Sequence, residues 1–182
     1  GGYLRYETSG AGSGHAVAVY DTALGVNNIT VKNLKLTGYA QYTTNVEADN
    51  TANQANGQWF NGVSVMGYNT GRCRNCKVIN IEGHRIGKNV VFTDCMEGFY
   101  AEDIRGVECN LHTFGATVQY GNFGANATWP ADFNPSLEVK GIYGTNTRTL
   151  FDLSTTGATK DDKGPKIPIA KISSVFGRNI QY

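Results

Sequence analysis

The 182-residue chain has little charge and no strong clustering of it. Only 17% of its residues are Asp, Glu, Lys or Arg, and 16 basic side chains stand against 15 acidic ones. No basic run exceeds two residues, so we expect no nucleic-acid groove. No apolar stretch approaches the ~20 residues that a membrane-spanning helix needs, so we expect no membrane insertion.

Two familiar N-terminal features are missing as well. The chain opens with Gly1-Gly2-Tyr3 instead of methionine, and no secretory signal is visible in the sequence. We therefore expect a mature piece or a fragment of a longer protein. Flanking segments would then be able to carry a partner site or a catalytic site.

Neutral polar residues have to cover most of the surface when charge is scarce. The chain contains 23 Gly and 18 Asn, a composition typical of β structure with many turns. Aromatic and β-branched residues occur throughout, which argues against disorder. One domain of this length can bury a substantial core.

The four cysteines do not form a convincing metal site. Cys73 and Cys76 form a C-x-x-C pair, but Cys95 and Cys109 lack the tight second pairing typical of structural zinc sites. Arg74-Asn75 between the first two does not suggest the helix start of a redox motif. Cys76 and Cys95 align with Leu34 of a related segment, which favours core thiols over a metal site or a disulfide.

A short internal repeat organises the sequence. The clearest copies are segments 28–38, 71–83 and 89–96, in which apolar and polar residues alternate around an Asn or Asp, and the first two end at a Gly. Weaker copies are segments 101–104, 139–142 and 170–172. Alternation with a period of two turns one face of a short strand inward.

The Asn or Asp of each copy is expected to lie at a bend between two strands. These residues tolerate the left-handed backbone region and hydrogen-bond to nearby backbone groups. Stacked coils would then align Asn33, Asn75 and Asp94 in a ladder of amide and carboxyl groups. The spacing predicts coils of about 20 residues once residues 41–60 are taken as an inserted loop.

The pattern predicts an all-β fold, namely a parallel β-helix with long inserted loops and an irregular C-terminal segment. One domain spans 1–182, with a clear repeat over 14–110 and a capping or chain-association segment over 111–182. An antiparallel sandwich is the main alternative, although Asn-Gly occurs only at 56–57 and 61–62. Leucine-rich repeats lack support because regular leucine spacing is absent.

Residues 26–36, and the stretch from Asn61 to Cys76, resemble the coil signature of the pectin lyase-like superfamily of right-handed parallel β-helices. The resemblance is good over about 14–110 and poor elsewhere, and it specifies architecture better than chemistry. The superfamily includes polysaccharide lyases and hydrolases and bacteriophage tailspikes.

The long polar insertion and the irregular C-terminal third favour the tailspike or tail-appendage type. The resemblance then implies a homotrimer, located in a virion tail or outside the cell, that recognises host cell-surface polysaccharide. Tailspikes often cleave the glycans that they bind, so the resemblance leaves open whether this chain is also a polysaccharide hydrolase or lyase. A free polysaccharide lyase or hydrolase is the first alternative. A non-catalytic structural or adhesive β-helix is the second. An open end of such a fold exposes strand edges, so association or a flanking domain is expected.

Candidate catalytic residues are Glu82, Glu97 and Glu102. Glycosidases need two carboxylates ~5–9 Å apart, and outward acids on neighbouring coils ~4.8 Å apart meet that spacing. The competing interpretation is that these acids are solvated residues on the outside of a coil. Gly83-His84-Arg85 matches the Gly-His-Gly of polygalacturonases only in part, so no active site of that family transfers to this chain.

Candidate substrate-binding residues fall into two groups. His84 and Arg85 are suited to bind a uronate or to act as base and charge stabiliser. Trp59, Tyr120 and Trp129 offer aromatic faces on which sugar rings stack, although rings in the C-terminal part also suit an end cap or a chain contact. We predict no metal site and no cofactor.

Overall fold

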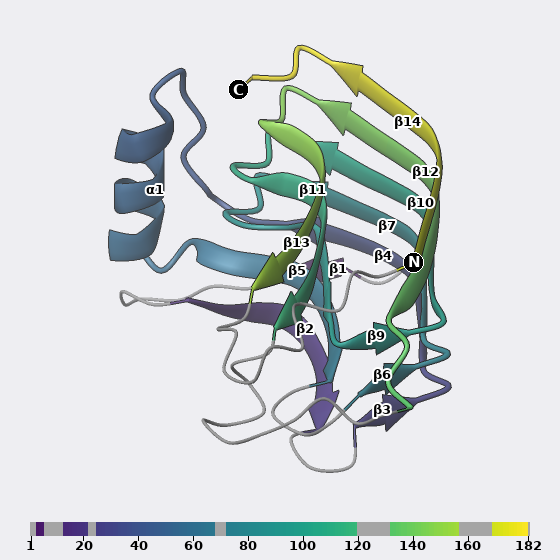
Figure 1. The fold of residues 1–182 in the computed structure, drawn as a ribbon. Helices are drawn as coiled ribbons and strands as arrows, with labels where there is room; N and C mark the ends of the chain where they lie inside the picture. The colour runs from purple at the N-terminus through teal and green to yellow at the C-terminus, as the bar shows by residue number, and fades with distance from the viewer. Residues whose placement is uncertain are drawn as a thin grey trace.

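The computed structural model describes residues 3–5, 13–21, 25–67, 72–119, 132–156 and 169–181. Over these residues the chain is all-β, with one helix and three parallel sheets (Figure 1). Sheet A consists, in spatial order, of β1 (Tyr3–Arg5), β4 (Thr30–Thr37), β7 (Lys77–His84), β10 (Phe99–Val107), β12 (Ser136–Thr145) and β14 (Ile169–Arg178). Sheet B consists of β13 (Thr149–Thr156), β11 (His112–Gln119), β8 (Val91–Asp94), β5 (Trp59–Gly67) and β2 (Ser13–Asp21). Sheet C consists of β3 (Val26–Asn27), β6 (Cys73–Arg74) and β9 (Met96–Glu97).

The chain passes through the three sheets in a fixed order. It runs from sheet B to sheet C to sheet A three times, as β2-β3-β4, β5-β6-β7 and β8-β9-β10. It then alternates between sheets B and A through β11, β12, β13 and β14. The strands of sheet A lie one above another, and every pairing between strands is parallel (Figure 1). The prediction of an all-β fold is confirmed, and the stacking continues past residue 110.

Left-handed residues form a column across the middle of sheet A. The register places Lys32 opposite Ile79 and Leu34 opposite Ile81, so Asn33 and Asn80 lie in adjacent layers. The full column is Asn33, Asn80, Asp103, Gly141 and Ser174, all with positive φ. Each left-handed residue interrupts the alternation of inward and outward side chains along its strand, as a β-bulge does, so that the inward positions shift by one residue beyond it. In β10, Ala101 and Ile104 are therefore both buried.

Two further columns mark the corners between sheets. Asn28, Asn75 and Gly98 form the corner between sheets C and A, and Arg85, Glu108, Asn146 and Asn179 form the corner after sheet A. Asparagine amides bond along the columns, with Asn80 Nδ2 donating to Asn33 Oδ1 at 3.0 Å and Asn179 Nδ2 to Asn146 Oδ1 at 3.0 Å.

The predicted ladder of Asn33, Asn75 and Asp94 is wrong in its register. Asn33 and Asn75 belong to two different columns, and Asp94 lies in β8 of sheet B, opposite Met66. The shortest coil spans 23 residues, from Asn80 to Asp103. The predicted ladder mixed columns because each coil contains several left-handed bends, and Asn33 and Asn75 look alike in sequence. Residue type identified the bends, but it did not identify which bends stack.

The core lies between the sheets. It contains the valine, isoleucine and phenylalanine side chains that point inward, and all four cysteines are fully buried thiols without a disulfide, as predicted for Cys76 and Cys95. A column of glycines in sheet A makes room for this packing. A Cβ on Gly83 would lie 2.6 Å from a Val90 methyl, and a Cβ on Gly106 would lie 2.5 Å from Thr113 Oγ1.

The segment between β4 and β5 contains helix α1 (Val46–Ala55), where the sequence predicts only a loop. Asn45 caps the helix, its Oδ1 accepting from the backbone of Ala48 at 3.0 Å. The helix stands beside the sheets (Figure 1). Only two of its residues, Asp49 and Asn53, are buried, so polar contacts hold the helix in place, chiefly at one acidic residue.

That residue is Asp49, which has no exposed surface. Its carboxylate accepts hydrogen bonds from the Thr43 backbone and hydroxyl and from Gln41, and it pairs with Arg148 Nη2. Burial alone would raise the pKa of Asp49, but the hydrogen bonds from Thr43 and Gln41 and the charge of Arg148 lower it. Arg148 Nε also donates to Asn110 Oδ1 at 2.9 Å. This network holds the segment between β4 and β5, which contains α1, against the residues that precede β11 and β13.

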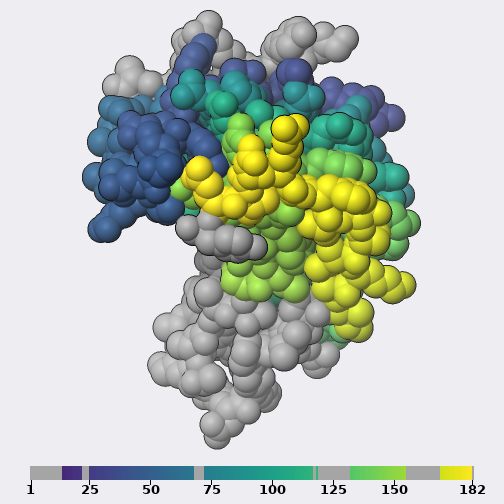
Figure 2. Space-filling view, turned by 90° about the horizontal axis from the view of Figure 1, so that it is seen from above, coloured from purple at the N-terminus to yellow at the C-terminus, as the bar shows by residue number. Residues whose placement is uncertain are grey.

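The last layer of sheet A is open. Residues 169–181 lie over the layer below when the molecule is viewed from above, with the helix to one side (Figure 2). Every residue of β14 is exposed, including Ile172 and Val175, which occupy inward positions opposite Val139 and Ile142.

Candidate functional site

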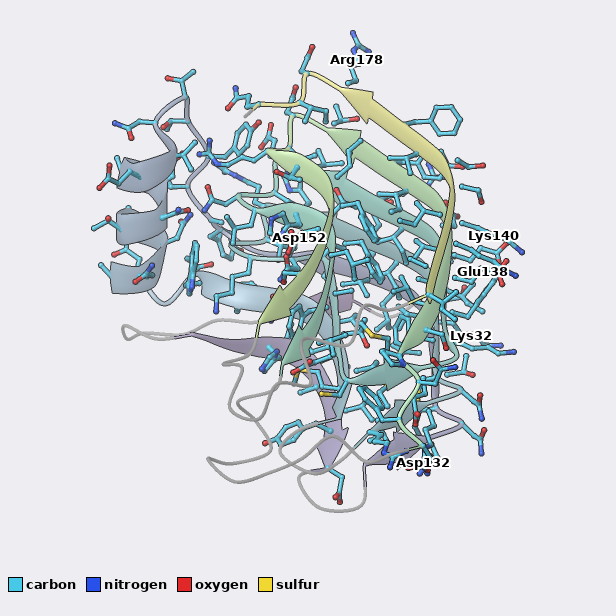
Figure 3. All side chains as sticks on the ribbon, viewed as in Figure 1. Lys32, Asp132, Glu138, Lys140, Asp152 and Arg178 are labelled. Atoms are coloured by element: carbon cyan, nitrogen blue, oxygen red, sulfur yellow. The ribbon has the colours of Figure 1, made fainter. Side chains whose placement is uncertain are left out.

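The outer face of sheet A brings together polar and aromatic side chains from β4, β7, β10, β12 and β14. Three rows cross the sheet from layer to layer, as the strand register requires. The first row is Lys77, Tyr100, Glu138 and Lys171; the second is Lys32, Ile79, Glu102, Lys140 and Ser173; the third is Lys35, Glu82, Arg105, Tyr143 and Phe176. Lys32, Glu138 and Lys140 all point away from the sheet (Figure 3).

Two aromatic rings lie parallel in the third row. The rings of Tyr143 and Phe176 are 5.5 Å apart between centroids, with 8° between their planes. Arg105 lies over the Tyr143 ring, with Cζ 4.9 Å from its centroid, and is held there by an ion pair with Asp103 at 3.0 Å. Because Phe176 is 58% exposed, these two rings offer an accessible apolar edge on an otherwise polar face.

A second group surrounds Tyr100. Lys140 Nζ lies 5.4 Å from the centroid of the Tyr100 ring and 3.0 Å from Glu138 Oε1. The Tyr100 hydroxyl donates to Glu102 Oε2 at 2.8 Å, and this hydrogen bond raises the pKa of Tyr100. The hydrogen bond with Glu138 raises the pKa of Lys140. A cavity of about 290 Å³ lies beside this group, and its lining includes Tyr100, Glu138 and Lys171.

The structure places two of the predicted acids on this face, but not side by side. Glu82 is on β7, where Lys35 Nζ lies 2.6 Å from Oε1. Glu102 is on β10, opposite Ile79, which lies three residues before Glu82. At about 3.3 Å per residue the two positions are offset by roughly 10 Å along the strands, which is more than a catalytic pair of carboxylates allows.

The third predicted acid, Glu97, lies at sheet C. Its carboxylate accepts from Arg74 Nε at 2.7 Å and from the backbone of Asn134 at 2.9 Å, and it lies 3.4 Å from Arg72 Nη1. Arg72 also pairs with Asp132 at 2.8 Å. The side chain of Glu97 is only 15% exposed, so its geometry is that of an anchor for residues 132–134.

His84 and Arg85 do come together, on a shared acid that the sequence did not single out. His84 Nε2 and Arg85 Nε both lie 3.6 Å from Glu108 Oε2. Arg85 and Glu108 are both left-handed residues of the corner after sheet A. His84, Arg85 and Glu108 therefore form a cluster at the border of sheet A, in the layers of β7 and β10.

Of the predicted aromatic residues, Trp59 begins β5 of sheet B, and Lys88 Nζ lies 5.4 Å from the centroid of its ring. Trp59 is thus not part of the sheet A face. Tyr120 and Trp129 lie outside the described residues.

Sequence reasoning missed one polar column altogether. His15, Asn61, Asn89 and His112 occupy equivalent places at the start of sheet B and are hydrogen-bonded to one another in that order. The sequence did contain a signal that the four residues share. Two positions after each of them stands an apolar residue of the core, namely Val17, Val63, Val91 and Phe114. The two histidines, 97 positions apart in the sequence, become ends of one array.

No family model, no curated protein and no solved structure matches the chain. Among the residues that the structure describes, no helix is long and apolar enough to cross a membrane. The same residues contain no group of three or more His, Cys, Asp or Glu side chains placed to hold a metal ion.

Proposed function

We propose that the chain is a right-handed parallel β-helix domain of the pectin lyase-like kind, of the type found in bacteriophage tailspikes and tail appendages. In this proposal it acts in a virion tail or outside the cell and recognises host cell-surface polysaccharide with the outer face of sheet A. The repeated passage through three parallel sheets supports the β-helix. Solenoid folds commonly bind extended ligands along the surface that their repeats create.

The observation that carries the proposal is the pair of stacked rings, Tyr143 and the exposed Phe176, beside a row of charged side chains. Sugar rings present apolar faces that stack on aromatic side chains and hydroxyl groups that bond charged and polar side chains. Tyr100, with its cavity and its neighbours Glu138 and Lys140, supplies a second contact of the same kind one row away.

Binding of purified bacterial capsular and surface polysaccharides, measured by calorimetry, tests the proposal. We expect Tyr143→Ala and Phe176→Ala each to weaken binding of the recognised polysaccharide at least tenfold. Tyr39→Ala is the matched control, because Tyr39 is 49% exposed and lies outside sheet A. If no polysaccharide binds, or if Tyr39→Ala is as harmful as the sheet A variants, the proposal fails.

The homotrimer belongs to the same proposal. Ile172 and Val175 occupy inward positions of β14 yet are 42% and 41% exposed, and such apolar surface favours association. The mass of the protein in solution, measured by light scattering, tests this part directly. A stable monomer at micromolar concentration would count against the tailspike type and would favour a free enzyme or an adhesive domain.

Cleavage of the bound polysaccharide is a separate question, for which the structure suggests one pair of acids. Glu138 lies opposite Tyr100, two residues before the position opposite Glu102, so the two residues occupy diagonal positions of neighbouring strands about 8 Å apart along the backbone. That separation suits an inverting hydrolase. Release of reducing ends or unsaturated products, lost in Glu102→Gln and in Glu138→Gln, is the expected result for an enzyme. Binding without any product would favour the adhesin.

A further inference from the structure

A partly buried lysine at the start of sheet B has no acidic partner among the residues that the structure describes. The backbone N–H of Lys88 donates to the carbonyl oxygen of Phe60 at 2.9 Å, which fixes the lysine beside β5. Burial is the only cause that shifts the pKa of Lys88, and it lowers that pKa. An ammonium group that leaves water without a carboxylate partner is costly, so this position favours an anion from solution.

Trp59 and His15 border the same lysine. Lys88 Nζ lies 5.4 Å from the centroid of the Trp59 ring, and the charge of Lys88 contributes to lowering the pKa of His15. Trp59 and Asn61 are two residues apart in β5 and therefore point to the same side of the sheet, and the register places Asn61 opposite His15. The side chains of Trp59, Lys88 and His15 are all partly exposed, so a ligand reaches them from solvent.

The direction of the hydrogen bonds in the sheet B column gives His15 an outward donor. Asn61 Oδ1 accepts from the backbone N–H of Asn89 at 3.2 Å and from Asn89 Nδ2 at 2.8 Å, which identifies the oxygen of the Asn61 amide. Asn61 Nδ2 therefore donates toward His15 Nδ1 at 3.3 Å, and the Ser64 hydroxyl, 2.7 Å from the same nitrogen, donates as well. In the neutral ring Nδ1 then carries the lone pair and Nε2 carries the proton. Because Asn61 and Ser64 are buried, the exposed edge of the ring presents the Nε2–H.

We propose that Lys88, His15 and Trp59 form a binding site for an acidic sugar, a hexuronate whose carboxylate meets the lysine and whose pyranose ring lies beside the indole. Lys88 supplies the positive charge, and His15 Nε2–H donates a hydrogen bond to the same carboxylate. The ring of Trp59 offers an apolar surface to the C–H groups of the sugar. The site lies on sheet B, apart from the polysaccharide-binding face proposed on sheet A.

Binding of sodium glucuronate to the full chain, measured by NMR titration, tests the site. We expect Lys88→Gln and Trp59→Ala each to weaken binding at least about tenfold, whereas Lys88→Arg should keep most of the affinity because it retains the charge. Tyr20→Ala is the matched aromatic control, since Tyr20 is 55% exposed on the same sheet but lies further along β2 than His15. Equal affinity in wild type and Lys88→Gln would overturn the proposal.

Two simpler ligands test whether both parts of the site are used. Glucose lacks the carboxylate, and acetate lacks the pyranose ring. Each should therefore bind at least about tenfold more weakly than glucuronate, since each loses one set of contacts. Binding of either compound as tightly as glucuronate would show that the site is not one for an acidic sugar.

A measurement on the wild-type protein decides the question even if a variant does not fold. A carboxylate bound at Lys88 and His15 favours the protonated imidazole, so glucuronate should raise the pKa of His15, followed through its ring resonances. A pKa of His15 that stays unchanged at saturating glucuronate would overturn the proposal. Polysaccharide binding at sheet A is read with the Tyr143 and Phe176 variants, so either proposal can fail while the other stands.

Discussion

The outer faces of sheets A and B are built from the same outward positions of parallel strands, but they differ in solvation. On sheet A, charged side chains pair with near neighbours such as Lys35 with Glu82, and remain 35% to 52% exposed. On sheet B, uncharged Asn61 and Ser64 are buried and bonded in a directed chain. Pairwise exposed contacts contribute little to stability, whereas buried polar chains depend on every member.

The two faces therefore differ in how strongly a substitution is expected to destabilise the fold. Side chains on sheet A can vary with little effect on folding, which suits a recognition surface. Side chains on sheet B cannot be removed without leaving buried donors or acceptors unpaired. Four predictions test the contrast, and they run from the largest expected effect to the smallest.

The largest effect is expected at the buried ion pair beside sheet B. Asp49→Ala leaves the Arg148 guanidinium buried without its carboxylate, because the side chain of Arg148 is only 4% exposed. We expect a loss of about 3–5 kcal/mol in the free energy of unfolding, measured by urea denaturation. Glu47→Ala, an exposed acid of the same helix, is the control and should cost under about 0.5 kcal/mol.

The next effect concerns the centre of the polar column. Asn61→Ala removes the acceptor of two Asn89 N–H groups and a donor to His15. We expect a loss of about 2–4 kcal/mol in the same measurement, since each unpaired buried group costs about 1–3 kcal/mol. On sheet A, Lys32→Ala should cost less than about 0.5 kcal/mol. Equal losses at the two positions would remove the contrast between the faces.

A pH dependence is expected from the two histidines of the column. Burial is the main cause that lowers the pKa of both His15 and His112 from the ordinary 6.5, with Lys88 adding to the effect at His15 and Asp152 opposing it at His112. Well above pH 6.5 both rings are neutral in the folded and in the unfolded chain. As the pH falls below 6.5 the unfolded chain binds protons first, so stability falls until the folded-state pKa values are passed. Urea midpoints at pH 7.5 and 5.5 should converge in the double variant His15→Gln, His112→Gln; an unchanged gap would contradict the assignment.

The smallest effect belongs to the exposed column of sheet A. Asn80 has φ 54° and donates to Asn33 at 3.0 Å. Asn80→Ala should cost about 1–2 kcal/mol, because alanine is strained in the left-handed region and cannot form the hydrogen bond. Asn80→Gly should recover part of that loss, since glycine has no such strain. If both variants were equally destabilised, the hydrogen bond and not the backbone would explain the position.

Much of the architecture was readable from local pattern. Period-two alternation predicted short strands, and the Asn residues identified bends, which the positive φ of Asn33 and Asn75 bears out. The helix α1 was not readable, because its position depends on Asp49 meeting Arg148, 99 residues away. Among the candidate acids, the pattern predicted that Glu82 and Glu102 lie on outer faces, but it did not predict their offset along the strands.

The sequence by itself determined that this chain is a stack of short parallel strands with polar bends, because alternation and turn chemistry act over neighbouring residues. Only the tertiary structure decided which bends and which outward side chains stack, because coils of unequal length, 23 residues at the shortest, hide the register from any fixed spacing. The sheet B column shows this most clearly. His15, Asn61, Asn89 and His112 become neighbours only when four successive layers align. The local pattern predicts the strands, and the register of the layers determines which side chains become neighbours.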